Sequence, residues 1–231
     1  MIAAAGFFAD YGAEMLQSTR EHIVLTLIAI LIACVIAVPL GVLLARCRAK
    51  LLVNIVMTMV NIIQPIPSLA LVAMTVVLFY LINEFLGARV LATLGIAPAL
   101  VALVAYALLP ILRNTYTGIR QVDPAVVEVA TGMGMTRRQI LFQVQLPLAL
   151  PFIMAGVRIS TVWTIGVATL VSLVGAGGLG DLIFRGLSTY RINLILAGAA
   201  PAVALALLFD WLLGRLEKWL TPSGSQPTQA L

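Results

Sequence analysis

Long apolar runs separated by short polar stretches dominate the pattern of the chain. The runs without a charged residue are Ile23–Ala45, Leu51–Ile82, Val90–Leu112, Ile159–Gly180 and Ile192–Phe209. A helix needs about 20 apolar residues to cross a hydrocarbon core of about 30 Å. The pattern therefore predicts an all-α integral membrane protein with about five transmembrane helices.

The run Leu51–Ile82 is longer than one span requires, and Gln64-Pro65-Ile66-Pro67 interrupts it. It fits either one bent helix or two short ones. Basic residues help to decide, and they gather in two regions: Arg46, Arg48, Lys50; and Arg113, Arg120, Arg137, Arg138. Lys/Arg-rich loops stay in the cytoplasm, so the two regions should share a side. The run then crosses once, with Pro65 and Pro67 as a bend.

This count places the N-terminus outside and the C-terminus, with Arg215 and Lys218, in the cytoplasm. Ser18–Glu21 has the spacing of a capping box and predicts the start of the first helix. The N-terminal residues lack a basic leader, so the first run is expected to act as an uncleaved anchor. The expected organisation is a single transmembrane domain over 1–220 and a disordered cytoplasmic tail over 221–231, which is rich in Pro, Ser and Gln.

Composition excludes a soluble domain. Hydrophobic residues make up 62% of the 231 residues and charged residues 10%, and the mean hydropathy is +1.11, whereas soluble domains are about a quarter charged. The net charge of +5 comes from 14 Lys+Arg against 9 Asp+Glu. These cations lie at the ends of apolar runs, as in cytoplasmic loops, which argues against nucleic-acid binding.

Few residues could carry catalysis or bind a metal. His22 is the only histidine, and Cys34 and Cys47 lie in different environments. We therefore expect no metal site, disulfide framework or catalytic triad. His22 is expected at the membrane interface. No GxxxxGK[ST] phosphate loop occurs, so ATP must bind another chain.

Gly175–Gly180, with the sequence GAGGLG, matches the dinucleotide pattern GxGxxG. The pattern follows an apolar helix and not a strand, so it does not predict nucleotide binding. We interpret its glycines as a bend with close helix packing at the outer end of the fourth span. They are Gly175, Gly177, Gly178 and Gly180.

A polar insert separates two membrane-length segments at about 123–147. Asp123-Pro124 predicts a helix start, and the apolar residues after it share one face: Val126, Val129, Ala130 and Met133. Gly132 and Gly134 predict its end, because glycine tolerates positive φ. Thr136–Gln139 forms a second capping box.

The second half of the insert carries Ile140, Leu141 and Val144, and Pro147 and Pro151 are expected to end it before the fourth span. The prediction is two short amphipathic helices joined by a glycine elbow on the cytoplasmic face. Such helices need a partner surface. Composition leaves two partners open, the lipid surface and a cytoplasmic protein.

Several stretches resemble a known family. Glu128-Val129-Ala130, Gly134, Val144 and Leu146-Pro147 resemble the EAA loop of binding-protein-dependent ABC importer permeases, with Val129 and Val144 departing conservatively from the usual alanine and isoleucine. Residues 21–46, 64–74 and 173–187 are similar to the subgroup that imports glycine betaine, choline, carnitine and related osmoprotectants.

The resemblance implies a type I importer in the bacterial cytoplasmic (inner) membrane. Two permease subunits, identical or different, would form the pathway. A cytoplasmic ATPase dimer would hold ATP and Mg, and an extracytoplasmic binding protein would deliver cargo. The loop would couple to the ATPase through Glu128, Ala130, Gly134, Arg137, Arg138, Leu146 and Pro147. Methionine or another amino acid is the rival cargo.

Residues within the spans suggest a pathway only weakly. Aromatic faces attract quaternary ammonium ions, which favours Trp163 and then Tyr106 as pathway residues over Phe79 and Tyr80 near a span end. Asp210 is expected near the cytoplasmic end of its span, in a structural role. An intramembrane enzyme would need paired acids or a nucleophile with a base. An ion-driven transporter would leave the insert unexplained.

Overall fold

A computed structural model of the chain describes residues 2–63, 65–88 and 90–220, so the predicted tail 221–231 lies outside the described residues. The described part is helical and contains no strand. Its elements are α1 (Ile2–Arg46), α2 (Lys50–Ile63), α3 (Ser68–Leu86), α4 (Ile96–Arg120), α5 (Pro124–Gly132), α6 (Arg137–Gln139), the π-helix η1 (Ile140–Gln145), α7 (Leu146–Ala168), the 3₁₀-helix η2 (Leu170–Val174), α8 (Leu179–Ser188) and α9 (Ile192–Leu220).

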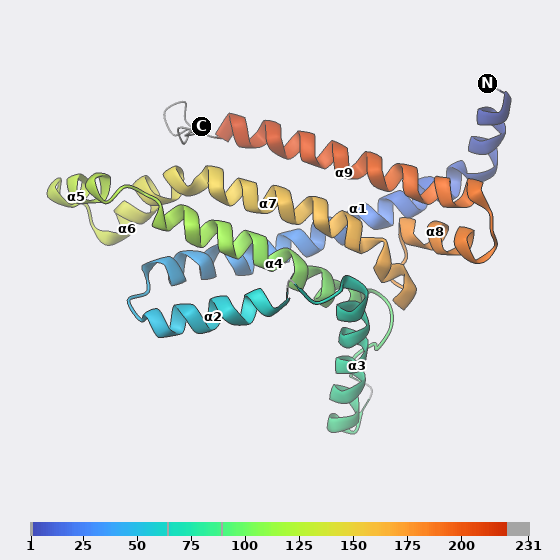
Figure 1. Cartoon of the computed structure of the whole chain (residues 1–231), viewed down its shortest axis with the longest axis horizontal. Helices are drawn as coiled ribbons and strands as arrows, with labels where there is room; N and C mark the ends of the chain where they lie inside the picture. The colour runs from blue at the N-terminus through green and yellow to red at the C-terminus, as the bar shows by residue number, and fades with distance from the viewer. Residues whose placement is uncertain (1, 64, 89, 221–231) are drawn as a thin grey trace.

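Four long helices, α1, α4, α7 and α9, run side by side as a bundle (Figure 1). α5 and α6 project from one end of this bundle, and α8 lies near the other. Among the described residues, five helical segments are long and apolar enough to cross a membrane: Tyr11–Arg46, Ser68–Leu86, Ile96–Arg120, Arg137–Ala168 and Ile192–Leu220. The predicted all-α fold with five spans is therefore confirmed.

Small residues let α1, α4 and α7 approach closely. Gly41 of α1 faces Thr115 of α4, where an added Cβ would lie 2.8 Å from the threonine Cβ. Gly156 of α7 meets the backbone of α4 in the same way, with an added Cβ 2.9 Å from the Pro110 carbonyl oxygen. Lipid tails are as apolar as the helix surfaces, so the hydrophobic effect does little to bring helices together in a membrane. Close packing of this kind holds the helices together instead.

The predicted start of the first helix at Ser18–Glu21 is wrong. α1 begins at Ile2 and passes through this segment without a break. Residues before it are mostly good helix formers such as alanine, methionine and leucine, so the capping spacing falls inside a helix. Glu21 binds elsewhere instead, as described below.

The second apolar run divides at its prolines. α2 ends at Ile63 and α3 begins at Ser68, with Pro65 in a turn between them. α2 lies along the bundle, whereas α3 turns away and runs across it (Figure 1). Val53 and Val60 of α2 join the core formed by α1 and α4. Proline removes a backbone donor, which explains the helix break.

The predicted bounds of the remaining spans need correction. The third span begins at Ile96 instead of Val90. The fourth is not Ile159–Gly180, because α7 ends at Ala168 and joins η1 and α6 without a gap. Pro147 and Pro151 therefore lie in α7 and do not end a helix before it.

Candidate functional site

The polar insert begins with a capped helix. The Asp123 carboxylate accepts a hydrogen bond from the Ala125 backbone N–H at 2.9 Å, and Pro124 occupies the first helical position. The side chain satisfies an N–H that would otherwise lack a partner, and the proline fixes φ for the first turn. α5 therefore starts where the sequence predicts.

Gly134 ends α5 in a left-handed conformation, with φ +82°. The Met135 N–H donates to the Ala130 carbonyl at 3.2 Å, and the Gly134 N–H donates to the Thr131 carbonyl at 3.0 Å. These two bonds form a Schellman motif, which fixes the direction in which the chain leaves the helix. An added Cβ at Gly134 would meet nothing within 4 Å, so only the backbone conformation requires glycine here.

Thr136 starts the next helical segment through a complete capping box. The Thr136 hydroxyl accepts from the Gln139 backbone N–H at 3.3 Å, and the side-chain amide oxygen Oε1 of Gln139 accepts from the Thr136 backbone N–H at 2.8 Å. This segment is not the second short helix that the sequence predicts, because α6 is only the first turn of a helix that continues through η1 into α7. The insert is thus one short helix and an elbow fixed to a long membrane helix.

The insert is attached to the bundle on one face only. Ala130 and Ile140 are 2% and 6% exposed, and Arg46 at the end of α1 donates to the Arg137 carbonyl at 3.1 Å. The other predicted coupling residues Glu128, Arg137, Arg138 and Pro147 are exposed, and Leu146 is half-buried. Several apolar side chains of the insert are exposed as well: Val126, Val129, Met133 and Phe142.

Glycines shape the opposite end of the bundle. Gly175, Gly177 and Gly178 have φ of +81°, +77° and +88°. Gly180 allows the closest packing, since an added Cβ would lie 1.9 Å from the Thr169 carbonyl oxygen. The Gly178 N–H donates to the Glu21 carboxylate at 3.2 Å, which joins this turn to α1.

His22 is buried between the helices of the bundle. Its side chain is 1% exposed, and its Nε2 lies 3.1 Å from the Ile165 carbonyl oxygen. Eight residues before His22 on α1, Glu14 forms an ion pair with Arg185 of α8. Partial burial raises the pKa of the Asp181 carboxyl in α8; Arg185 opposes the rise, and Glu21 and Glu14 add to it.

The structure also contains an ion pair that the sequence did not reveal. Arg158 Nε and Nη2 donate to the two Asp210 oxygens at 2.6 and 2.7 Å. Asp210 lies ten residues before the end of α9. Arg158 lies in the middle of α7. The signal available in the sequence was a single charged residue, without an oppositely charged neighbour, in each of two apolar segments.

The predicted pathway aromatics lie apart. Trp163 of α7 is 47% exposed and borders the Arg158–Asp210 pair. Tyr106 of α4 is half-buried, and its hydroxyl donates to the Ile66 carbonyl near the break between α2 and α3. Tyr106 therefore supports the proline turn, whereas Trp163 stays accessible.

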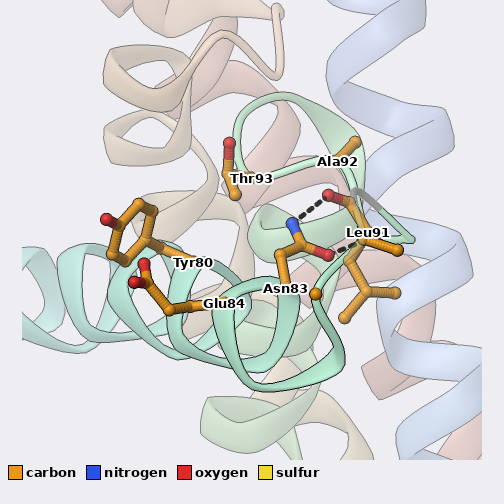
Figure 2. Close-up of a pocket in the computed structure, with 8 residues that line it drawn as sticks. Tyr80, Asn83, Glu84, Leu91, Ala92 and Thr93 are labelled. Carbon is orange, nitrogen blue, oxygen red and sulfur yellow. Dashed lines mark hydrogen bonds between the residues drawn. The ribbon is translucent and has the colours of Figure 1, made fainter.

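A wide pocket of about 880 Å³ lies beside the end of α3 (Figure 2). Asn83 faces the loop after α3, where it donates to the Leu91 carbonyl at 2.8 Å and accepts from the Leu91 N–H at 2.8 Å. Tyr80 and Glu84 lie together on the other side. The Asn83 amide therefore holds the loop in place. Within residues 2–63, 65–88 and 90–220, no group of three or more His, Cys, Asp or Glu could hold a metal ion.

Sequence comparison relates the chain to transport proteins. Residues 37–222 match the family described as binding-protein-dependent transport system inner membrane component. The carnitine transport permease protein OpuCB of Listeria monocytogenes is 44% identical, covering 96% of this chain and 95% of that protein. The choline transport system permease protein OpuBB of Bacillus subtilis is 45% identical, covering 97% of both.

Structural comparison gives a consistent result. A permease-like chain in an inward-facing structure of the MetNI methionine ABC transporter superposes with a TM-score of 0.77 at 25% sequence identity, covering 90% of this chain and 96% of that one. An amino acid ABC transporter with histidines superposes with a TM-score of 0.64 at 22% identity, which supports the fold alone.

Proposed function

Since the chain belongs to the family of binding-protein-dependent transport system inner membrane components, we propose that it forms the pathway for quaternary ammonium osmoprotectants in an ATP-driven importer. The chain is a multi-pass transport component of the inner membrane, with transport and not catalysis as its role. The observation that carries the cargo class is the 44–45% identity to a carnitine permease and a choline permease. The methionine transporter is only 25% identical.

We assign the coupling role to residues 123–147. A segment that transmits a movement must resist bending, and both ends of α5 are fixed by hydrogen bonds at Asp123 and Gly134. Beyond the elbow, the chain has no flexible joint before α7, because α6 and η1 are helical. A displacement of the exposed face of α5 is therefore passed to a membrane helix.

The exposed face of the insert supports a protein partner over lipid. Val129 and Met133 are 63% and 69% exposed, and Glu128, Arg137 and Arg138 of the same insert are exposed. Exposed apolar side chains in a segment that also carries charges of both signs are typical of a protein interface. The partner is the cytoplasmic ATPase dimer, which binds ATP and Mg. A second permease subunit and an extracytoplasmic binding protein complete the importer.

Uptake into vesicles tests the function. Vesicles containing the permease, its ATPase and its binding protein should accumulate labelled glycine betaine only with ATP, and unlabelled choline or carnitine should compete. Accumulation of methionine with no quaternary amine would reject the cargo class and leave the transport role intact.

Co-purification tests the coupling face separately. Glu128→Ala, or Arg137→Ala with Arg138→Ala, should weaken retention of the ATPase by the permease. Arg191→Ala, at the opposite end of the bundle next to α9, removes a charge without touching this face and is the control. Equal retention by all three variants would contradict the assignment.

A further inference from the structure

A charged cluster lies where α7 and α9 meet. The Arg158 guanidinium binds both Asp210 oxygens and lies 3.9 Å from a Glu217 oxygen. Arg158 is ten residues before the end of α7 and Asp210 ten residues before the end of α9, which at a rise of about 1.5 Å per residue places each about 15 Å from a helix end. Charged side chains on membrane-spanning helices face protein or a water-filled cavity and not lipid.

The cluster borders a groove of about 400 Å³, a size within the range of about 300–1,000 Å³ typical of small-molecule sites. Its wall is apolar at Ala155, Ile159 and Val162, and Trp163 stands beside the charges. The side chains of Arg158 and Asp210 are 38% and 42% exposed. A ligand in the groove can therefore reach the indole and the carboxylates together.

The residues around the groove match one kind of ligand. One arginine and two carboxylates leave a formal charge of −1. A quaternary ammonium ion has no N–H to donate, so it is held by opposite charge and by aromatic faces, of which tryptophan is the strongest. The carboxylate that glycine betaine and carnitine also carry would find its complement in the Arg158 guanidinium.

We infer that the α7–α9 groove binds the quaternary ammonium cargo within the membrane, with Trp163 against the ammonium group and Asp210 and Glu217 supplying its countercharge. Arg158 positions Asp210 and receives the cargo carboxylate where there is one. This inference rests on the proposed cargo class. A mere clamp between α7 and α9 would not need the open space beside Trp163.

Binding without the binding protein tests the groove. The permease with its ATPase, reconstituted in nanodiscs with and without a non-hydrolysable ATP analogue, is titrated with radiolabelled glycine betaine. Wild type should bind saturably in at least one of these states. Trp163→Ala should bind about 2- to 30-fold more weakly, the range expected for losing one cation–π contact.

Trp211→Ala is the matched control, because Trp211 also lies on a span but packs its ring against Arg215, 4.9 Å from the guanidinium carbon, and does not line the groove. Its affinity should equal that of wild type. Equal affinity of Trp163→Ala and wild type overturns the inference, as does the absence of wild-type binding in both states.

A charge swap separates binding from structure. Arg158→Asp combined with Asp210→Arg keeps an ion pair between α7 and α9 but exchanges its ends. The double variant should assemble with its ATPase like wild type and yet lose glycine betaine binding. Unchanged binding would mean that the pair only clamps the helices.

Competition tests the chemical class. Choline should displace the label, whereas its neutral tert-butyl analogue should not, and equal displacement by both would overturn recognition of the charge. The uptake experiment with wild type keeps the two proposals distinguishable. If wild type imports glycine betaine and the Trp163 and charge-swap variants have the same KM for it as wild type, the groove is not the cargo site. The proposed function then still stands.

Discussion

Arg46 and Arg137 join the end of α1 to the start of the helix that becomes α7, because the guanidinium of the first donates to the carbonyl of the second at 3.1 Å. Arg46→Ala should free the insert from α1 at a cost of about 1 kcal/mol, the size of an exposed hydrogen bond from a charged group. We expect more ATP hydrolysed per cargo transported. Arg48→Ala, which removes a neighbouring charge, is the control, and an unchanged ratio in Arg46→Ala would show that this bond carries no coupling.

Substitutions at Gly134 test whether the glycine elbow must be rigid. Its φ of +82° is unfavourable for a β-branched residue by about 1–2 kcal/mol or more, although space for a side chain exists. Gly134→Val should therefore insert into the membrane but lose ATPase retention and uptake, whereas Gly134→Asn should keep most of both. Gly132→Ala lies in the helix with open space around it and should behave like wild type. Normal uptake by Gly134→Val would contradict the rigid elbow.

Gly180 should be sensitive for the opposite reason, namely lack of space. An added Cβ would lie 1.9 Å from the Thr169 carbonyl oxygen and 2.4 Å from the Ser172 hydroxyl. Overpacking of this kind costs about 1–3 kcal/mol or more, so Gly180→Ala should lower the thermal unfolding temperature in detergent. Gly166→Ala, where nothing lies within 4 Å, should leave that temperature unchanged. Equal temperatures for both variants would argue against the tight contact.

Asp181 is expected to make the stability of the folded protein depend on pH. Burial raises the pKa of its carboxyl above the ordinary value of 3.8, so the native state favours the protonated form. Stability from this group is complete below pH 3.8 and is lost as pH rises through the native pKa. Asp181→Asn should thus be more heat-stable than wild type at pH 7, and the difference should shrink as pH falls towards 4. If the stability difference between Asp181→Asn and wild type grew on acidification, the pKa of Asp181 would be lowered and not raised.

Membrane orientation can be tested by cysteine labelling. Arg46, Arg48, Lys50 and Arg120 line one groove, so the two basic regions share an end of the bundle. We predict that this end is cytoplasmic. In a background without Cys34 and Cys47, an impermeant reagent applied to intact cells should miss cysteines at Lys50 and Gln139 and label one at Ser188. Labelling at Lys50 or Gln139 would contradict the orientation.

Local signals explain what the sequence could predict. Asp123, Gly134 and Thr136 act on backbone groups within a few residues of themselves, so the cap, the elbow and the capping box could be identified from spacing alone. The same local rule failed at Ser18, because spacing does not reveal whether a helix is already formed upstream.

Long-range contacts explain the errors. Arg158 pairs with Asp210, 52 residues away. Without its partner, Arg158 appeared to end an apolar run, which moved the fourth span too far towards the C-terminus. His22 similarly depends on Ile165, 143 residues away. The pairing of Arg158 and the burial of His22 follow from the packing of distant helices and have no signature in a single segment.

The π-helix η1 interrupts the regular geometry of the continuous helix from Arg137 to Ala168. A π turn contains more residues than an α turn, and its backbone bonds span five residues instead of four. Side chains before and after η1 are therefore out of phase with the pattern of one continuous α-helix. If η1 rewinds as an α-helix, α7 rotates about its own axis relative to α6 without either segment bending. A rotation about the helix axis, as well as a displacement along it, can then pass from one end of this helix to the other.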